Sequence, residues 1–224
     1  MLRTLQGTTL ELVATGAPEA LVADLWSFLD EIAAGGHLQA GAVFRYGPLL
    51  LRLSGRPGRL QVVAPAYEED GSGAVEQDLG RQLTACGWQT TLCARLGAEP
   101  CWASLDAQLG VFGDPLAGAG AVYGHRLEAE AEVPGGSSGW LLACAAAPAL
   151  LDGAVAALGA AYPQGIAPMR VGALLAACPA LVPALALPAG WSAQIHAGRL
   201  IAVYDPDGHE TLAASALARL IAPA

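Results

Sequence analysis

Three short apolar runs separated by tight turns constrain the fold of this chain more than any other feature. They are residues 41–46, 49–54 and 59–64. Each has the length of an ordinary strand and is too short to bury one face of a helix. The last two are joined by Gly-Arg-Pro-Gly at 55–58, and such a turn is typical of a β-hairpin. The sequence therefore predicts antiparallel strands in this region.

Helical periodicity lies on both sides of these predicted strands. Apolar residues over 21–32 recur at helical spacing, and Gly-Gly at 35–36 predicts the end of that helix. A second, shorter helix is expected over about 74–85, followed by an alternating strand at 88–96. With a further strand at 8–14, the first half has the order β-α-β-β-β-α-β.

The second half alternates between strand-like and helix-like segments. Residues 126–133 alternate apolar and acidic side chains, as half-exposed strands do, and a glycine-rich turn leads to a buried strand at 140–146. A hairpin is expected around Ala197-Gly198. Helices are expected at about 149–161, 170–177, 179–186 and 211–221.

This order of elements predicts an α+β fold with mixed or antiparallel sheets and packed helices. The periodic signal is weakest between residues 101 and 133, where glycines are frequent. A domain boundary is expected there, which gives two similar-sized α+β domains, 1–112 and 113–224. A single compact unit is the alternative.

Composition excludes several classes of chemistry. The chain has no Lys and no Asn, and all 11 basic residues are Arg. It can therefore use neither a lysine Schiff base nor a P-loop lysine. Although 54% of the residues are apolar, proline and charged residues interrupt the longest apolar stretch, so no membrane span is expected. The N-terminus lacks a signal-peptide pattern, and we expect a soluble, cytoplasmic protein.

The cysteine spacing favours neither disulfides nor a metal centre. Five is an odd number, no two cysteines form a CxxC pair, and a chain of 224 residues does not need disulfides to be stable. We expect free, buried thiols in a reducing compartment, with neither a bound metal nor a cofactor. The cysteines are Cys86, Cys93, Cys101, Cys144 and Cys178.

The net charge of −9 argues against direct nucleic-acid binding and against anionic membranes. The acids are concentrated in two places, either as solvated faces or as surfaces that steer a basic partner into contact. We take both as candidate partner-binding surfaces. The first contains Glu68, Glu69, Asp70, Glu76 and Asp78, and the second contains Glu128, Glu130 and Glu132.

One string resembles the nucleophile motif of a serine hydrolase. Residues 135–139 spell Gly-Gly-Ser-Ser-Gly, a formal G-x-S-x-G match centred on Ser137, with Asp207 and His209 downstream. A nucleophile elbow needs a buried parallel strand before the serine and a helix after it. Here an acidic strand and a proline precede the serine and a strand is expected to follow. A hairpin turn is favoured over a catalytic serine.

Other apparent sites have simpler structural explanations. The glycines of 118–124 form GxGxxxG, but neither a preceding apolar strand nor a following helix supports a dinucleotide site. The Asp-Pro-Asp-Gly turn at 205–208 lacks the remaining ligands of a calcium loop. The four histidines are expected at the surface or as capping residues. The five tryptophans are expected to anchor the core, with a binding hot spot as the alternative.

Three segments of the C-terminal half form a recognisable pattern: Ser-Gly-Trp at 138–140, VGALLAACPALVPALALPAGW at 171–191 and the hairpin RLIAVYDPDG at 199–208. With these segments, this part of the chain resembles immunity proteins of bacterial polymorphic-toxin and type VI secretion systems. The resemblance implies an α+β protein that binds and neutralises a cognate toxin effector encoded beside it. It implies neither a catalytic residue nor a cofactor.

The charge distribution and this resemblance lead to the same expectation. An acidic surface can occlude the basic cleft of a toxin, for example of a nuclease, by placing carboxylates where phosphates bind. Two alternatives remain: a chaperone or adaptor that carries an effector to its secretion machine, and a serine hydrolase that uses Ser137.

Overall fold

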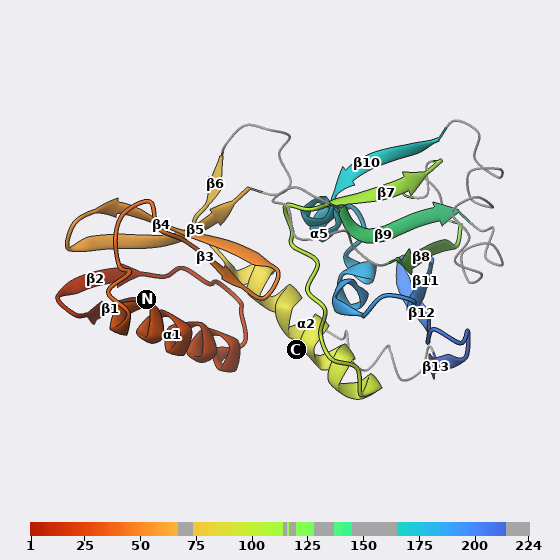
Figure 1. Cartoon of the computed structure of the whole chain (residues 1–224), viewed down its shortest axis with the longest axis horizontal. Helices are drawn as coiled ribbons and strands as arrows, with labels where there is room; N and C mark the ends of the chain where they lie inside the picture. The colour runs from red at the N-terminus through yellow and green to blue at the C-terminus, as the bar shows by residue number, and fades with distance from the viewer. Residues whose placement is uncertain (67–73, 114–115, 117–119, 128–136, 145–164, 214–224) are drawn as a thin grey trace. The chain divides into compact units, whose positions relative to one another are not determined.

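The computed structural model describes residues 1–66, 74–113, 116, 120–127, 137–144 and 165–213 (Figure 1). The chain divides into two compact units, residues 1–87 and 88–224. Each unit contains a mixed open sheet with helical elements, so the predicted α+β class is confirmed. None of the helices among the described residues is long and apolar enough to cross a membrane.

The sheet of the first unit has the strand order β1-β2-β5-β4-β3, and β6 pairs with β5 outside this path. Its β2 and β5 are parallel and its other pairs are antiparallel. The three apolar runs predicted as strands are β3, β4 and β5, and the turn predicted between the last two is present. The strands are β1 (Leu2–Leu5), β2 (Thr8–Glu11), β3 (Val43–Tyr46), β4 (Leu49–Arg56), β5 (Arg59–Pro65) and β6 (Val75–Glu76).

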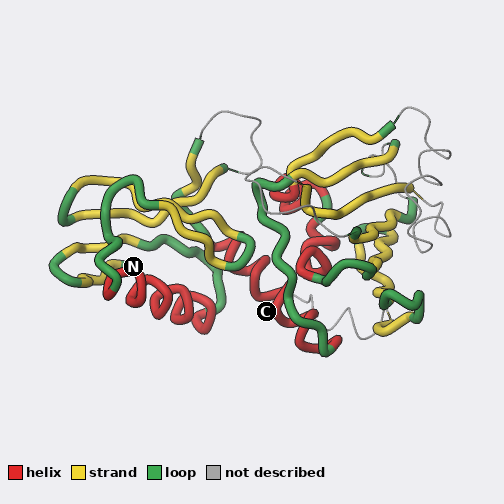
Figure 2. Tube along the Cα trace, viewed as in Figure 1, coloured by secondary structure: helices red, strands yellow, loops and turns green. Residues whose placement is uncertain are grey.

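Helix α1 (Glu19–Ala34) lies along one face of this sheet, as Figure 2 shows. Its apolar side chains bury themselves against the sheet at the predicted helical spacing. Contacts reach both edge strands. Phe28 packs edge-on against Phe44 of β3 with ring centroids 6.5 Å apart, and Asp30 forms a 3.0 Å ion pair with Arg3 of β1. The core of the unit therefore lies between α1 and this face.

Helix α2 (Gly80–Leu96) corrects the expectation for residues 74–96. The predicted strand at 88–96 is wrong, because those residues continue the helix through Gly87. The buried residues Gln82, Cys86, Gln89 and Cys93 recur every three or four positions, which is a helical period. A Cβ atom on Gly87 would lie 2.6 Å from Cδ1 of Leu21, so this glycine permits close packing against α1.

The second unit contains a seven-stranded sheet in the order β10-β7-β9-β8-β11-β12-β13. Strands β7 and β9 are parallel, and every other neighbouring pair is antiparallel. The strands are β7 (Gln108–Phe112), β8 (Val122–Arg126), β9 (Ser137–Cys144), β10 (Ile166–Arg170), β11 (Ser192–His196), β12 (Arg199–Tyr204) and β13 (Glu210–Ala213).

Three short helical segments follow β10: η1 (Val171–Ala173), α5 (Leu174–Ala177) and η2 (Pro179–Ala186). Every residue of η2 after Pro179 is buried, and Trp140 of β9 is 1% exposed, as a core anchor should be. The helix predicted at 170–177 is present as η1 and α5 but begins at Val171, because Arg170 ends β10, and the helix predicted at 179–186 is the 3-10 helix η2.

Two expectations near the C-terminus have different outcomes. The hairpin around Ala197-Gly198 is confirmed as β11 and β12. The prediction of a helix at 211–221 is wrong for its first residues, because residues 210–213 form strand β13, which pairs with β12. The remainder of that segment, and the helix expected at 149–161, lie outside the described residues.

Candidate functional site

The first acidic segment, residues 68–78, can be placed only in part. Glu76 ends β6, and its carboxylate accepts a hydrogen bond from Nε2 of Gln82 at the start of α2. Glu76 is half-buried and takes part in the packing between β6 and α2. Three other acids of this segment lie outside the described residues: Glu68, Glu69 and Asp70.

Asp78 has a structural role at the beginning of α2. Its Oδ1 accepts hydrogen bonds from the backbone N–H of Gly80, at 3.0 Å, and of Thr15, at 2.8 Å. The first satisfies a backbone N–H at the first turn of α2, as a capping side chain does, and the second fixes the loop after β2. Hydrogen bonding from Thr15, and then from the backbone N–H of Gly80, lowers the pKa of Asp78 below its ordinary value of 3.8.

The second acidic segment follows directly after β8. The N–H of Leu127 donates to the carbonyl of Gly139 at 2.9 Å, so the pairing of β8 with β9 extends one residue beyond Arg126. The strand predicted at 126–133 therefore begins earlier, at Val122. The three candidate residues of this segment lie outside the described residues: Glu128, Glu130 and Glu132.

Ser137 has the surroundings of a turn residue and not of a nucleophile. It is the first residue of β9, so a strand and not a helix follows it, and its Oγ accepts a 3.1 Å hydrogen bond from the N–H of Gly139. Asp207 and His209 lie beyond β12, which is three strands away from β9. At roughly 4.8 Å per strand, that separation is about 14 Å across the sheet. These three residues do not form a triad.

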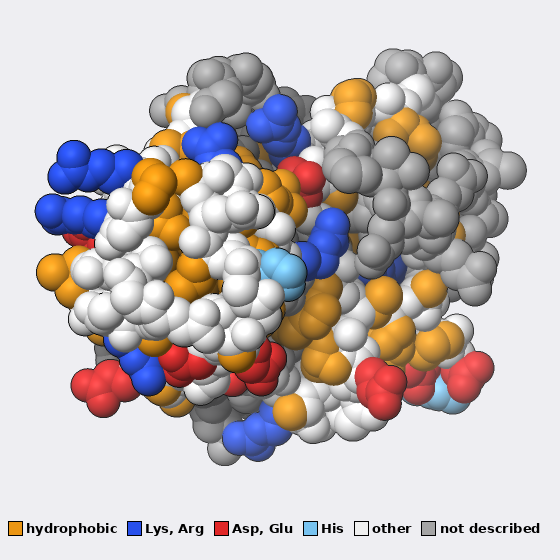
Figure 3. Space-filling model, turned by 60° about the vertical axis from the view of Figure 1, so that its left-hand side comes forward, with side chains coloured by type: hydrophobic (Ala, Val, Ile, Leu, Met, Phe, Trp, Pro, Cys, Tyr) orange, Lys and Arg blue, Asp and Glu red, His pale blue; other side chains and the backbone are white. Residues whose placement is uncertain are grey.

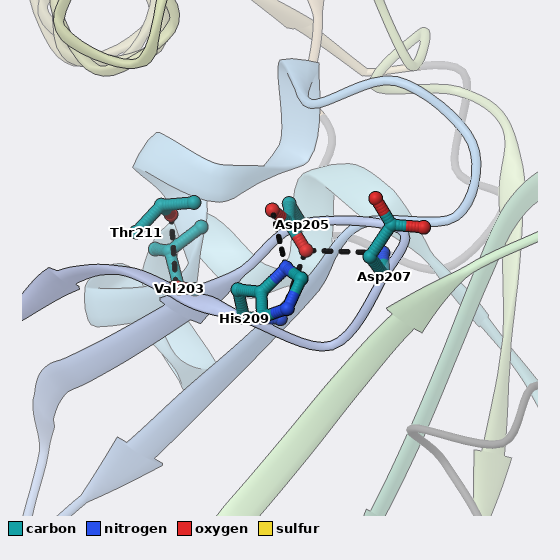
Figure 4. Close-up of polar contacts among 5 residues, drawn as sticks. All are labelled: Val203, Asp205, Asp207, His209 and Thr211. Carbon is teal, nitrogen blue, oxygen red and sulfur yellow. Dashed lines mark hydrogen bonds and ion pairs between the residues drawn. The ribbon is translucent and has the colours of Figure 1, made fainter.

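The turn after β12 brings Asp205, Asp207 and His209 together (Figure 4). Oδ1 of Asp205 accepts hydrogen bonds from the N–H groups of Asp207 and His209, at 3.0 and 2.9 Å. Its Oδ2 lies 3.5 Å from Nδ1 of His209. The N–H of His209 is the main cause of a lowered pKa for Asp205. Turn geometry accounts for this cluster, because all three of these contacts are made to the carboxylate of Asp205.

A buried histidine–serine pair joins β8 to β11, and sequence reasoning missed it. Nδ1 of His125 lies 2.8 Å from Oγ of Ser192, and the two residues are 5% and 3% exposed. Burial lowers the pKa of His125 below its ordinary value of 6.5, which keeps the imidazole neutral. The expectation that every histidine lies at the surface or caps an element is therefore wrong for His125. The pair is too enclosed for a substrate to reach Ser192.

A second polar contact lies beside this pair on the same face of the sheet. Nε2 of Gln194 donates to the hydroxyl of Tyr123 at 2.6 Å, and the hydroxyl of Tyr204 donates to Oε1 of Gln194 at 3.1 Å. Gln194 is opposite Tyr123 in the register, just as Ser192 is opposite His125. The period-2 alternation places Tyr123 and His125 on one face of β8 and Ser192 and Gln194 on one face of β11, but only the register between the strands brings the four side chains together.

The guanidinium of Arg126 is buried among backbone carbonyls. It donates to the carbonyl oxygens of Cys101, Leu185 and Leu187 at 2.5, 2.9 and 2.6 Å. Leu185 lies in the last turn of η2, and Leu187 directly follows the helix. Backbone carbonyls at a helix end have no partner within the helix. Burial lowers the pKa of Arg126, but a guanidinium still remains charged at neutral pH. Arg126 therefore ties β8 to the end of η2.

All five cysteines are free, as predicted, but the expectation that they are all buried is wrong for Cys101. Cys86, Cys93 and Cys178 are buried, whereas Cys144 is partly buried and Cys101 is exposed. Burial raises the pKa of Cys86 to about 12 and that of Cys93 to about 11, so both stay protonated at neutral pH.

The second unit is also the part of the chain that matches a known family. The model of the Imm33-like domain matches residues 88–206, just over half of the 224 residues. The match includes the first two segments on which the sequence resemblance rests, 138–140 and 171–191, and residues 199–206 of the third. No curated protein and no solved structure was found to match the chain. The buried Arg126, the His125–Ser192 pair and the Trp140 anchor all belong to the matched region, and the chain is a member of the Imm33-like family, which is of the immunity-protein type.

Proposed function

We propose that this protein is an immunity protein that binds a cognate bacterial toxin effector and blocks its active cleft with an acidic surface. The observation that carries the proposal is the Imm33-like domain over residues 88–206. The effector is of the polymorphic-toxin or type VI secretion kind, as the sequence resemblance implies. A basic cleft, such as that of a nuclease, is the chemistry that an acidic inhibitor of net charge −9 complements.

Two acidic segments are the proposed contact surfaces. Glu128, Glu130 and Glu132 lie inside the region that matches the family, and this supports testing them alongside the segment at 68–78. Within the earlier segment, Glu68, Glu69 and Asp70 are the residues to test. Asp78 is a poor choice there because its carboxylate caps α2, and its substitution would change folding together with charge.

The test is rescue of a bacterium that expresses the neighbouring toxin gene. The wild-type chain should restore growth, and purified protein should bind the toxin with an association rate that falls as salt concentration rises. Replacing Glu128, Glu130 and Glu132 with Arg should slow association by roughly tenfold or more at low salt. Glu99→Arg is the control, since Glu99 is an exposed acid outside both segments.

Two results would reject parts of this proposal. If reversal of both acidic segments leaves association at low salt unchanged, the acidic-surface mechanism is wrong. If loss of the protein blocks delivery of the effector and leaves the producing cell unharmed, the chain is a chaperone or adaptor and not an immunity protein.

A further inference from the structure

One face of the first unit's sheet is covered by α1 and the other face carries arginines. Directly opposite residues of an antiparallel pair share a face, and residues two apart along a strand do as well. Leu51 and Leu53 of β4 are buried on the α1 face. Arg52 and Arg56 alternate with them, so both lie on the opposite face, where both are exposed.

Two more arginines belong to this opposite face. Arg59 of β5 is directly opposite Arg56, and Arg45 of β3 is opposite Leu50, which lies two residues before Arg52. All four arginines are exposed, and among the described residues none of them forms an ion pair or a side-chain hydrogen bond. In the space-filling view, arginine side chains gather at the upper left (Figure 3).

A hollow of about 430 Å³ opens at the hairpin end of this face. Its polar lining consists of Arg56, Arg59, Ser54, Gln61 and Glu11, and Glu11 is the only acid within strands β1 to β5. Gly55 lines the hollow and allows β4 and β5 to approach each other closely there. Its φ is +133°, and a Cβ atom there would lie 2.5 Å from the carbonyl oxygen of Arg59.

The Arg56–Arg59 pair is unfavourable for the isolated hairpin. Like charges directly opposite each other on one face of an antiparallel pair destabilise it. No described carboxylate pairs with either guanidinium, although Glu11 lines the same hollow. A bound carboxylate would remove this repulsion, and guanidinium groups bind carboxylates in a bidentate fork.

We propose that this arginine face (Arg45, Arg52, Arg56 and Arg59) docks an acidic polypeptide segment in extended conformation. Arg56 and Arg59 hold one carboxylate at the hollow, and Arg52 meets a second. Arg52 and Arg56 are four residues apart on one strand, which is about 14 Å, so the acids of the segment would be about four residues apart. Ser54 and Gln61 offer hydrogen-bonding groups to the backbone of the segment.

A polypeptide fits this surface better than a nucleic acid. Stable binding of a duplex through its phosphates uses roughly six to ten contacts with basic side chains, and this face has four arginines with Glu11 beside them. The net charge of −9 repels a long polyanion further. The proposal goes beyond the proposed function, because this surface lies outside residues 88–206 and has the opposite sign of charge.

The experiment is fluorescence anisotropy with the full-length protein and a labelled peptide of Glu and Ser in which the glutamates are four residues apart. The matched probe has Gln in place of Glu. The wild type should bind the Glu peptide at least roughly tenfold more tightly than the Gln peptide at low salt. The double variant Arg56→Glu/Arg59→Glu should lose that preference, and Arg56→Gln/Arg59→Gln should weaken it severalfold with less disturbance of the hairpin.

Arg199→Glu is the control variant. Arg199 follows the two-residue turn Ala197-Gly198, just as Arg59 follows Pro57-Gly58, and it is also exposed, in the other unit. This variant should bind the Glu peptide as the wild type does. Equal binding of the two peptides by the wild type, or equal loss in Arg199→Glu and the double variant, would overturn the proposal. Tighter binding of a duplex DNA than of the Glu peptide would overturn the choice of partner.

Discussion

Nε1 of Trp140 donates a 3.1 Å hydrogen bond to the carbonyl oxygen of Leu185, which joins strand β9 to the 3-10 helix η2. The guanidinium of Arg126 donates to the same oxygen at 2.9 Å. The segments 138–140 and 171–191 of the immunity-protein resemblance are therefore in direct contact, although 45 residues separate Trp140 from Leu185. Both fall within the Imm33-like domain.

Replacing Arg126 with Met should lower the free energy of unfolding by about 3 kcal/mol. The carbonyls of Cys101 and Leu187 would lose a buried donor, and each unsatisfied group costs roughly 1–3 kcal/mol. Urea unfolding followed by tryptophan fluorescence measures the change. Arg199→Met, at an exposed position, should change stability by less than about 0.5 kcal/mol.

Trp140→Phe should show energetic coupling with Arg126→Met, because both side chains donate to the carbonyl of Leu185. Either single variant leaves that oxygen with one donor, and only the double variant leaves it with none. The double variant should therefore be less stable than the sum of the single changes predicts, by roughly 0.5 kcal/mol or more. Simple additivity in a double-mutant cycle would contradict a shared acceptor.

His125 should make the protein less stable as pH falls below about 6.5. Burial depresses its pKa in the folded state, so at such pH the unfolded chain binds a proton that the folded chain does not. This contribution is fully present above pH 6.5 and is lost as pH falls toward the folded pKa. His125→Gln should flatten this part of the stability profile. Ser192→Ala should keep the dependence, because burial and not the hydrogen bond to Ser192 is its cause.

Asp78→Ala should destabilise the first unit by roughly 0.5–2 kcal/mol, which is the usual effect of losing an N-cap. Asp78→Asn should be nearly as stable as the wild type at neutral pH, since an amide oxygen can accept the same two backbone hydrogen bonds. The lowered pKa of Asp78 adds stability that is present above pH 3.8 and is lost at lower pH. Thermal unfolding at neutral and acid pH distinguishes the three proteins, and equal losses for Ala and Asn would contradict the capping role.

Arg59→Glu should make the hairpin more stable while it weakens binding of an acidic peptide. The substitution replaces a like-charge pair with an opposite-charge pair across from Arg56, which is worth roughly 0.2–1 kcal/mol. Denaturant unfolding measures the stability and anisotropy measures the binding. A variant that loses stability and binding together would instead indicate that the hairpin was disrupted.

Most elements of the fold could be predicted from local patterns. Helix α1 follows from apolar residues at helical spacing and from the glycines after it, and the β4–β5 hairpin follows from its Pro-Gly turn. The error at 88–96 has a physical cause. Threonine, tryptophan and cysteine favour strands locally, but tertiary packing along the buried face of α2 outweighs that preference.

The polar contacts of the second unit could not be predicted in the same way. Ser192 and His125 are 67 residues apart, and only the pairing register of β8 with β11 brings them to 2.8 Å. Arg126 gave no signal in the sequence because a buried guanidinium that binds carbonyls needs no acidic partner nearby. The role of Asp78 at the start of α2 could not be predicted either, because its hydrogen bond with the N–H of Thr15 joins residues 63 positions apart.

The sequence by itself determined the α+β class, the acidic charge, the absence of lysine chemistry and the resemblance to immunity proteins. These properties depend on composition and on patterns within a few residues, where local sterics and burial periodicity decide. Only the tertiary structure decided which face of the first sheet α1 covers and that four exposed arginines share the other face. That outcome depends on strand register and on which face α1 covers, and both are set by contacts between residues distant in sequence.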